Sequence, residues 1–480
     1  MFYGRETEIL KLNEMYNSGK FEFAVIYGRR RVGKTTLIRE FIKDKKSLFF
    51  AASESTAQDN LLSLSRCIGG SNAAPVFLDY ESALSDIFKA AVNDRFIFII
   101  DEFPYLAESY RGISSLLQIM IDHNKDNIKL MLILCGSSMS FMENQVLGHQ
   151  SPLYGRRTAQ FKIKPFNFFE SLPFFDGYRN EDKAVFYGIT GGVPEYLNKI
   201  NPEKTVRDNI IDMYLTPSGH FFEEPSNLIK QELREPSTYN VIIEAIASGS
   251  SRLNEIATKC KIESNKCAKY LSSLITLGLV SREYPYGEKV SKRSIYKLED
   301  NMFRFWYRFV FPNQSAIINE MGDAVYENLV KEQLNAYMGL VFEDICRQWF
   351  FMQAKKEPNE NSPPFFISSI GRWWGANPIT RKQEEIDIMA SHGDNALFAE
   401  CKWTNADVDI EVYNNMKRKS AMFEYKSQYL YIFTKYSMTS KVYAEHIKGH
   451  VKILSLDEII IADANKYFHN PASATPFLRG

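Results

Sequence analysis

The feature that most constrains the fold is a glycine-rich segment, Gly28-Arg-Arg-Arg-Val-Gly-Lys-Thr35, whose spacing is GxxxxGK[ST]. An apolar run, Phe23–Tyr27, precedes it, and a helical pattern begins at Thr36. A strand that passes through such a loop into a helix N-terminus directs backbone N–H groups at phosphate oxygens. We therefore expect a nucleotide's phosphates to be bound by Gly28, Arg29, Arg30, Arg31, Val32, Gly33, Lys34, Thr35 and Thr36.

A second apolar run supplies the acidic groups that phosphate chemistry requires. Phe96–Ile100 reads as a buried strand and is followed by Asp101 and Glu102. Asp101 and the Thr35 hydroxyl would then hold Mg²⁺, and Glu102 would polarise the attacking water. Lys34 would reach the β- and γ-phosphates. These residues together predict a site for hydrolysis of a nucleoside triphosphate.

Further apolar runs complete the predicted sheet. Leu48–Ala52 and Leu130–Leu134 also read as buried parallel strands, separated by helical patterns, which favours a doubly covered α/β sheet. Leu130–Leu134 leads into Gly136-Ser137-Ser138. We expect the Ser137 hydroxyl to lie between the two motifs and to sense the γ-phosphate. The alternative is a simple turn of small residues.

Together with three further segments, these motifs resemble the AAA+/STAND class of P-loop ATPases, and more narrowly the archaeal-type ATPase family. The segments are Phe2-Tyr-Gly-Arg5-Glu6-x-Glu8, Pro152–Arg157 and Gly191–Leu197. The resemblance implies that ATP and Mg²⁺ bind, and that Arg5 lines the base side of the pocket. It also implies that Gly191 to Pro194 begin a helical lid. Arg156 would then be either a finger for a neighbouring subunit's nucleotide or an ordinary structural arginine.

The middle of the chain has the pattern of a winged helix. Three short helical periods, at Val241–Ala247, Leu253–Cys260 and Ser264–Leu277, are followed by a hairpin over Val280–Leu298. The hairpin carries five basic residues against two acidic ones, Glu283 and Glu288. The basic residues are Arg282, Lys289, Lys292, Arg293 and Lys297. Such a patch predicts contact with DNA phosphates, and the alternative is a module that packs between domains.

The C-terminal region has two predicted neighbouring strands that carry a set of charged residues. Alternation places Glu400 and Lys402 on one face, opposite Asp387, and an upstream helix brings Glu343 towards the same edge. The set resembles that of restriction-endonuclease-like folds. The resemblance implies that Asp387, Glu400 and Glu343 hold Mg²⁺ and that Lys402 stabilises the transition state of DNA cleavage. The alternatives are a surface hairpin with an ordinary ion pair and a nuclease fold without activity.

The length and composition fit an α/β chain of several domains. With 480 residues, 45% hydrophobic, the sequence exceeds a single core. The predicted parts are an ATPase core, a helical lid, a winged helix, a connector and a nuclease-like α/β domain. Their ranges are 1–165, 166–235, 236–300, 301–335 and 336–465.

The charge balance and the cysteine pattern bear on partners and location. Basic and acidic residues are equal at 58 each, so any nucleic-acid binding must come from a local patch. Six scattered cysteines and the lack of a long apolar run predict a cytoplasmic protein without a membrane partner. Two functions remain open: an ATPase that acts on DNA, or a nucleotide-controlled signalling switch or scaffold that binds proteins. The sequence leaves a homo-oligomeric state open in either case.

Overall fold

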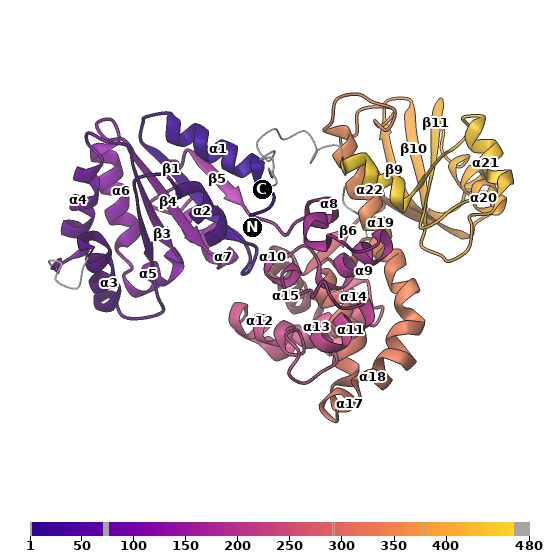
Figure 1. Cartoon of the computed structure of the whole chain (residues 1–480), viewed down its shortest axis with the longest axis horizontal. Coiled ribbons are helices and arrows are strands. Elements are labelled where there is room, and N and C mark those ends of the chain that lie inside the picture. The colour runs from indigo at the N-terminus through magenta and orange to yellow at the C-terminus, as the bar shows by residue number, and fades with distance from the viewer. Residues whose placement is uncertain (1, 71–75, 290, 292, 379, 465–480) are drawn as a thin grey trace, which may run out of the picture. The chain divides into compact units, whose positions relative to one another are not determined.

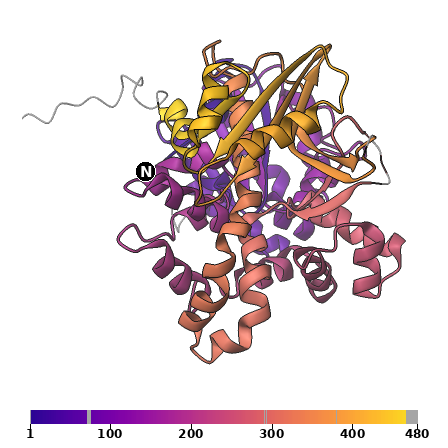
Figure 2. The same cartoon turned by 90° about the vertical axis from the view of Figure 1, so that its right-hand side faces the viewer.

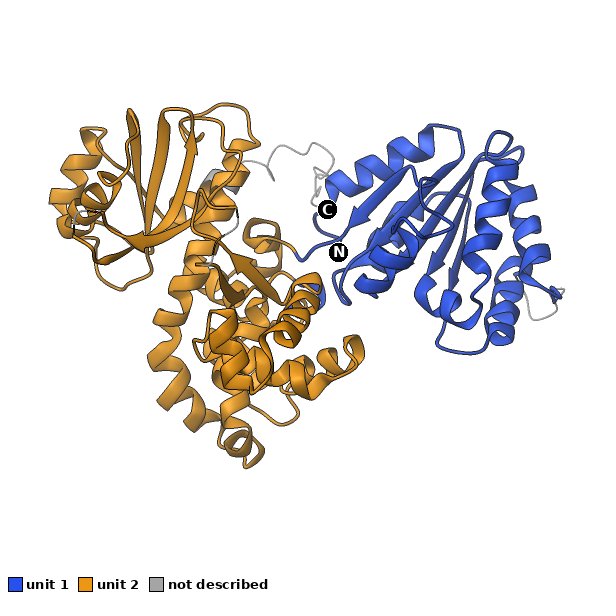
Figure 3. Ribbon diagram, turned by 180° about the vertical axis from the view of Figure 1, so that it is seen from behind, with its two compact units in different colours: residues 1–165, 193–196 blue, residues 166–192, 197–480 orange. Residues whose placement is uncertain are grey.

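The computed structural model of the chain describes residues 2–70, 76–289, 291, 293–378 and 380–464 (Figures 1 and 2). It divides into two compact units (Figure 3). Unit 1 comprises Met1–Pro165 and Val193–Tyr196, and unit 2 comprises Phe166–Gly192 and Leu197–Gly480. Lys292 of the predicted basic patch and residue 465, at the end of the predicted last domain, lie outside the described residues. None of the helices in the described ranges is long and apolar enough to cross a lipid bilayer.

Unit 1 is built on a five-stranded parallel sheet in the order β2-β3-β4-β1-β5. The strand that precedes the glycine-rich loop, β1, therefore lies between two neighbours. The four predicted strands are present, and a fifth, β5, had not been predicted. The strands are β1 Glu22–Tyr27, β2 Ser47–Ala51, β3 Phe96–Asp101, β4 Leu130–Gly136 and β5 Ala159–Lys162.

Helices cover this sheet on both faces, as the apolar strands require. Along β3, Ile97 and Ile99 pack with helices α1 and α2, while Phe98 and Ile100 are equally buried and face the other way. Figure 1 shows the helices around the strands. Those of unit 1 are α1 Glu6–Asn17, α2 Lys34–Ile42, α3 Ala57–Gly69, α4 Tyr80–Ala90, α5 Phe103–Ser109, α6 Ile113–Asn124, α7 Met139–Phe141 and α10 Pro194–Leu197, whose last residue belongs to unit 2.

The first part of unit 2 is helical. Its cores are rich in aromatic side chains, such as Phe186, which stacks on Phe175 with ring centroids 6.0 Å apart. Side chains and main chain also cap several helix ends: Asn167 and Glu170 form a reciprocal capping box on α8. The helices are α8 Phe168–Ser171, α9 Asn180–Thr190, α11 Val206–Tyr214 and α12 Glu224–Glu232, with a 3-10 helix at Leu172–Phe175.

Three helices and a two-stranded antiparallel hairpin follow, in the order that the winged-helix pattern predicts. On the third helix, Cys267, Tyr270, Leu271 and Leu274 are buried, which is the spacing of one helix face. The elements are α13 Pro236–Ala247, α14 Leu253–Cys260, α15 Ser264–Thr276, β6 Val280–Glu283 and β7 Ile295–Leu298.

A run of short helical segments connects the hairpin to the last domain. Its aromatic side chains are largely buried; Trp306, for example, donates from its indole nitrogen to the carbonyl of Phe222 at 2.9 Å. The segments are α16 Asn301–Phe305, α17 Gln314–Ile318 and α18 Gly322–Val325, with π-helical turns at Trp306–Val310 and Tyr326–Val330 and a 3-10 turn at Phe311–Asn313.

The C-terminal part is a mixed five-stranded sheet in the order β12-β11-β10-β9-β8. Strands β9 and β10 are antiparallel neighbours joined by a tight turn at Gly393, as predicted. The elements are α19 Lys331–Ala354, β8 Gly371–Ala376, β9 Gln383–His392, β10 Asn395–Lys402, α20 Ile410–Ser420, β11 Ser427–Thr434, α21 Ser440–Ile447, β12 Lys452–Ser455 and α22 Leu456–Ala464.

Helices pack on both faces of this sheet too. From α19, Trp349 packs against Phe433 of β11, with ring centroids 5.5 Å apart. The residue before it, Ile432, belongs to a core cluster with Tyr413 and Met416 of α20. Because side chains alternate along a strand, α19 and α20 lie on opposite faces. Helix α19 thus occupies the face from which Glu343 can approach the edge of β9 and β10.

Candidate functional site

Two glycines shape the loop between β1 and α2. A Cβ atom at Gly28 would lie 2.3 Å from the carbonyl oxygen of Ile163, so only glycine lets β1 pass this close to the end of β5. Gly33 has φ of +89°, a left-handed conformation that favours glycine, immediately before the first residue of α2. The main chain therefore turns abruptly and directs the N-terminus of α2 into the loop. This is the geometry of a phosphate-binding loop.

Lys34 is the first residue of α2, and its side chain bends back over the loop. The residue is 6% exposed, and its Nζ donates to the carbonyl oxygens of Gly28 at 2.9 Å and Arg29 at 3.1 Å. A buried ammonium group must have acceptors. Carbonyl oxygens supply them here, within the same loop that would surround a phosphate, so the charge lies where an anion would bind.

Thr35 and Asp101 meet although 66 residues separate them in the chain. The Thr35 hydroxyl donates to Asp101 Oδ2 at 2.9 Å. Asp101, the last residue of β3, is 6% exposed, and its other oxygen accepts from the Glu102 N–H at 3.0 Å. A hydroxyl and a carboxylate in contact at the mouth of a phosphate loop are ligands of the kind that Mg²⁺ takes. The donor set therefore fits a magnesium nucleotide.

Glu102 follows in a left-handed conformation, with φ of +51°, which is uncommon for a residue with a side chain. One of its carboxylate oxygens accepts from the Ser137 hydroxyl at 2.9 Å and from the Ser137 N–H at 3.2 Å. Ser137 follows the end of β4, next to β3, and is 3% exposed. The sequence predicted that Ser137 would lie between the motifs, and it does, but its hydroxyl binds Glu102.

The arginines near the loop bind protein groups that the sequence had not linked to them. Arg5 donates to the carbonyl oxygens of Lys164 at 2.5 Å and Val32 at 3.4 Å. Arg30 donates to the Tyr105 hydroxyl at 2.9 Å. Sequence reasoning missed Tyr105, which lies four residues after Asp101 and has no motif of its own.

Arg31 extends towards the segment that belongs to unit 1 despite its distance in sequence. Its Nε lies 3.8 Å from Glu195 Oε1, and its guanidinium lies 5.9 Å from the ring centroid of Tyr196. The same segment places Pro194 Cγ 3.7 Å from the Cβ position at Gly33. The predicted start of the lid thus contacts the phosphate loop itself. Glu195 was part of the motif quoted from the sequence but had no assigned role.

Arg156, the predicted finger, forms an ion pair within unit 1. Its Nη2 lies 2.6 Å from Asp122 Oδ2, its Nε donates to Asp122 Oδ1 at 2.8 Å, and its Nη1 donates to the Pro152 carbonyl at 2.9 Å. The hydrogen bond from Arg156 lowers the pKa of Asp122. These contacts are those of a structural arginine, and a role in a neighbouring subunit stays a prediction.

The C-terminal carboxylates converge at the end of β9 and β10. Asp387 Oδ2 accepts from the Cys401 N–H at 2.8 Å. Burial, and then the charge of Glu400, raise the pKa of Asp387 to about 6. Burial, and then the charge of Asp387, raise the pKa of Glu343 to about 8. Asp387 thus lies close enough to interact with Glu343 and with Glu400, and a metal site there stays a prediction.

Glu400 has a different surrounding from the one expected. Lys402 Nζ donates to its Oε1 at 2.8 Å, and Lys419 Nζ of α20 donates to its Oε2 at 3.3 Å. Within the described part of the chain, no three His, Cys, Asp or Glu side chains are grouped so that they could hold a metal ion. A metal cage of Glu343, Asp387 and Glu400 is therefore not formed. The pair Asp387 and Glu343 fits a cation whose other ligands are water and a substrate phosphate.

The predicted basic patch is largely engaged within the protein. Lys297 lies 2.7 Å from Glu283 and 3.3 Å from Asp344 of α19, and Arg293 forms an ion pair with Glu288. Arg282 donates to the Ser294 hydroxyl at 3.0 Å. The hairpin thus packs against α19 through charges, which is the alternative that the sequence left open.

Comparison with known proteins gives matches over most of the chain. A family described as an ATPase domain predominantly from Archaea matches residues 2–200, and one described as archaeal and bacterial proteins of unknown function matches residues 306–418. An uncharacterized protein of Methanocaldococcus jannaschii is 36% identical over 428 residues, 88% of this chain and 92% of that protein.

Two solved structures are similar at lower identity. The Walker-type ATPase of Pyrococcus abyssi shares 20% identity with a TM-score of 0.48, over 64% of this chain and 96% of its own. The Orc1 protein of Aeropyrum pernix, solved in complex with DNA, shares 15% identity with a TM-score of 0.34, over 70% of this chain and 95% of its own.

Proposed function

The chain belongs to the family of ATPases found predominantly in Archaea, and from this premise we propose that residues 1–165 bind ATP with Mg²⁺ and hydrolyse it. One observation carries the proposal: the 2.9 Å hydrogen bond between the Thr35 hydroxyl and Asp101. It joins the phosphate loop to the acidic end of β3, although β4 lies between β3 and β1 in the sheet. Proteins that hydrolyse nucleoside triphosphates need both halves, because the loop binds phosphates and the acidic half holds the metal.

Each residue then has a role that follows from its position. Lys34 exchanges its carbonyl acceptors for phosphate oxygens, and the loop N–H groups donate to the same oxygens. Thr35 and Asp101 would hold Mg²⁺, which supplies positive charge that neutralises charge developing on the phosphates. Arg5 and Arg31 fix the loop through Lys164 and Glu195.

Glu102 is the group that orients water for attack. Ser137 donates two hydrogen bonds to one oxygen of the Glu102 carboxylate. These bonds fix the carboxylate, so its other oxygen has a defined position from which to accept a proton from water. A carboxylate in a fixed position is a more effective general base than a mobile one, because it already lies where it can accept a hydrogen bond from the attacking water. The serine thus acts on hydrolysis through Glu102.

The test compares two substitutions in the full chain. Lys34→Ala removes the charge that binds phosphate, so ATP affinity and turnover should both fall. Glu102→Gln keeps the shape and the affinity but removes the base, so turnover alone should fall, by about 100-fold or more. Wild-type turnover in Lys34→Ala would refute the assignment of the site.

A second proposal concerns the C-terminal domain: metal-dependent cleavage of DNA phosphodiesters at Asp387, Glu343 and Lys402. The favouring observation is the half-buried carboxylates Asp387 and Glu343, whose pKa values are raised first by burial and then by the charge of a neighbouring carboxylate. Mg²⁺ or Mn²⁺ held there would supply a water of lowered pKa. Lys402, held by Glu400, would offset charge on the phosphate.

These two proposals join in a chain whose nucleotide state controls an action on DNA. The competing proposal is a nucleotide-controlled scaffold whose C-terminal domains bind proteins. Duplex and single-stranded DNA that stimulate ATP turnover of the wild-type chain would favour the first. A homo-oligomer that forms with nucleotide and is unaffected by DNA would favour the second. In such an oligomer, Arg156 could be tested for a role at the nucleotide of a neighbouring subunit.

A further inference from the structure

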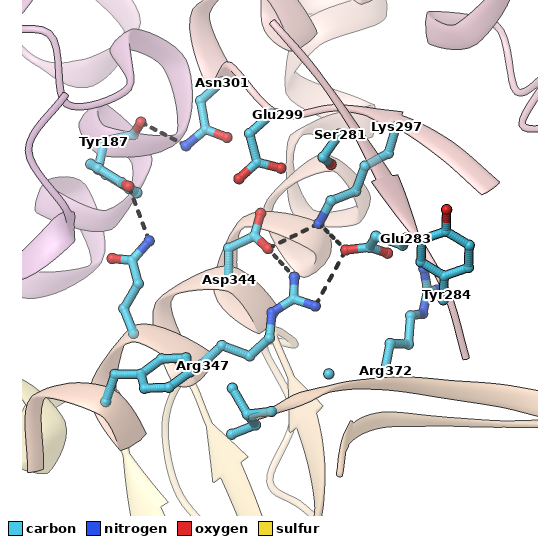
Figure 4. A pocket seen from close by; sticks show the side chains of 14 residues that line it. Tyr187, Ser281, Glu283, Tyr284, Lys297, Glu299, Asn301, Asp344, Arg347 and Arg372 are labelled. Atoms are coloured by element: carbon cyan, nitrogen blue, oxygen red, sulfur yellow. Dashed lines mark hydrogen bonds and ion pairs between the residues drawn. The ribbon is translucent and has the colours of Figure 1, made fainter. Parts of the chain in front are cut away.

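A cavity of about 340 Å³ lies in unit 2 between the hairpin and α19. Its walls come from the C-terminal end of α13, from β7, from the connector and from α19, and Arg372 of β8 completes it. A second cavity, of about 420 Å³, adjoins the same charged residues (Figure 4). The two share Glu283, Lys297, Asp344, Arg347 and Arg372. Of the residues that line the smaller cavity, Glu343 alone has a role in the sites proposed above.

The described residues that line the smaller cavity carry more positive than negative charges. Five are basic and three are acidic, and one of the basic ones, Arg372, forms an ion pair with Glu385 outside the cavity, which leaves four cations for three carboxylates. A cavity wall with excess cations favours an anion, because buried like charges repel unless an opposite charge is added. The basic residues are Lys297, Arg304, Arg308, Arg347 and Arg372, and the acidic ones are Glu283, Glu343 and Asp344.

Two of the acidic side chains are already shared among several cations. Asp344 lies 3.3 Å from Lys297 and 3.4 Å from Arg304, and it also pairs with Arg347. Glu283 lies 2.7 Å from Lys297 and 3.7 Å from Arg347. Figure 4 shows this network with Asp344 and Glu283 facing Lys297 and Arg347. Two carboxylates thus serve three cations, and Arg308 adds a fourth to the wall.

Arg304 has a buried donor that is not used. The residue is 9% exposed; its Nε and Nη2 donate to the Leu298 carbonyl at 3.1 and 2.6 Å. Its Nη1 is buried and makes no hydrogen bond with any described residue, and Glu283 Oε2 on the same wall is in the same state. Leaving such atoms without partners is unfavourable, because they lose the hydrogen bonds that water would supply. The cavity therefore offers one unused donor and one unused acceptor beside a surplus of cations.

We propose that this cavity binds a small phosphate ester that also carries hydroxyl groups, in the chemical class of a sugar phosphate. The phosphate accepts from Arg304 Nη1 and pairs with Arg308, and a hydroxyl donates to Glu283 Oε2. A phosphate group suits these arginines better than a carboxylate group, because it carries more negative charge and its oxygens match the planar fork of guanidinium donors. The volume suits a small ligand, and Ile246, Ile295 and Leu298 supply apolar walls for its carbons.

The test measures binding by calorimetry to the full chain carrying Lys34→Ala, so that phosphate is not bound by the loop of unit 1. The probes are ribose 5-phosphate, inorganic phosphate and ribose. We expect one equivalent of ribose 5-phosphate to bind, inorganic phosphate to bind more weakly and ribose not to bind. Because the ligand contacts both the hairpin and α19, it should also raise the melting temperature of unit 2.

Two added substitutions locate the binding. Arg308→Gln should weaken ribose 5-phosphate binding about tenfold or more, since it removes a charged partner. Arg179→Gln is the matched control: it removes an arginine that is paired with Asp182, on an exposed helix end outside the cavity, and should leave binding unchanged. If Arg308→Gln failed to fold, Arg304→Lys, which keeps the charge and removes the fork, would replace it.

Three results would overturn the proposal. One is the absence of binding of either phosphate probe at about 10 mM, a concentration far above ordinary effector affinities. Another is binding that both Arg308→Gln and Arg304→Lys leave unchanged. The last is a 5′-phosphorylated tetranucleotide that binds more tightly than ribose 5-phosphate, since the cavity would then receive a nucleic-acid end. Equal affinity for inorganic phosphate and ribose 5-phosphate would overturn the hydroxyl contact with Glu283.

Discussion

Glu102 combines an uncommon backbone conformation with two hydrogen bonds to its side chain. A residue with a Cβ atom pays about 1 kcal/mol to adopt φ near +51°, so the surrounding structure must hold it there. Ser137 does so through its hydroxyl and its N–H. Such strain is kept where a side chain must point in one direction. Ser137 therefore fixes the direction in which the Glu102 carboxylate points.

Replacing Ser137 should therefore slow hydrolysis without weakening nucleotide binding. Ser137→Ala removes one charge-assisted hydrogen bond and keeps the N–H contact, so we expect ATP turnover to fall about tenfold. ATP affinity, measured by equilibrium titration, should stay within about twofold. Ser138→Ala is the matched control, because Ser138 is the next residue in the chain and both hydrogen bonds described for the Glu102 carboxylate come from Ser137. Equal turnover in both variants would refute the positioning role.

Glu343 makes the stability of unit 2 depend on pH. Its folded pKa is raised to about 8, above the ordinary glutamate value of 4.5, so the folded chain binds more protons than the unfolded chain between these values. The free energy of unfolding therefore falls as the pH rises from about 4.5 to 8. The full size of the effect is about 1.4 kcal/mol for each unit of difference, reduced by the partial exposure of the group.

Glu343→Gln should remove most of this fall. Urea unfolding at pH 5, 6.5 and 8 should give a flatter profile in the variant, which becomes the more stable chain at pH 8. Glu332→Gln, an exposed substitution on the same helix, should keep the wild-type slope. The interpretation fails if wild type and Glu343→Gln have parallel profiles.

At the scale of elements, buried parallel strands were the easiest part to predict. Each is a short apolar run between polar residues, so Phe96–Ile100 and Leu130–Leu134 were placed within two residues of β3 and β4. The contact between Thr35 and Asp101 was also predictable, because the two apolar runs lead directly to these residues. Helix α19 was harder. Its start at Lys331 follows a π-helical turn directly and has no side-chain cap, so the sequence around it carries no signal for the beginning of a helix.

Partners that are far apart in the chain could not be predicted. Lys297 is a basic residue in the sequence, and only the fold shows that Asp344 is beside it. The same holds for Lys419, which forms an ion pair with Glu400, a predicted metal ligand. A sequence gives the net charge of a segment but not which acidic and basic side chains form ion pairs, because that depends on which surfaces the fold brings together.

The close approach of β1 to β5 gives a prediction at this scale. Gly28→Ala would place a Cβ atom 2.3 Å from the Ile163 carbonyl, so either the loop or the end of β5 must shift. We expect unit 1 to lose about 1–3 kcal/mol of unfolding free energy, measured with urea. Gly339→Ala is the comparison, since its Cβ would meet nothing within 4 Å and a helical alanine stabilises by about 0.5–1 kcal/mol. Unchanged stability in Gly28→Ala would contradict the steric argument.

At the scale of the whole molecule, the candidate sites divide between the two units. The phosphate loop and its acidic partners lie entirely in unit 1, and the carboxylate pair and the cavity lie in unit 2. Hydrolysis and C-terminal chemistry can therefore be removed one at a time. This separation makes the nuclease proposal testable in a chain that still hydrolyses ATP.

The last prediction is that the C-terminal carboxylates bind a divalent cation. Partial burial, and then the charge of Asp387, raise the pKa of Glu343, so a cation held by these two carboxylates should lower both pKa values. Calorimetry of the Lys34→Ala chain with Mn²⁺ should show one site, lost in Lys34→Ala with Asp387→Ala and weakened with Glu343→Ala. ATP turnover of the Asp387→Ala single variant should equal wild type, because the phosphate loop is in the other unit.

Cleavage of DNA should follow the same pattern. It should require the metal and be lost in both Asp387→Ala and Lys402→Ala, while Glu411→Ala, an exposed acidic change on α20, should leave it unchanged. Lys402→Ala should still bind Mn²⁺, since the lysine carries no ligand atom for a cation and acts on the phosphate. Identical Mn²⁺ uptake by chains with and without Asp387 would end the catalytic interpretation. The raised pKa values would then be explained by burial alone, since two neutral carboxylic acids need no cation to lie side by side.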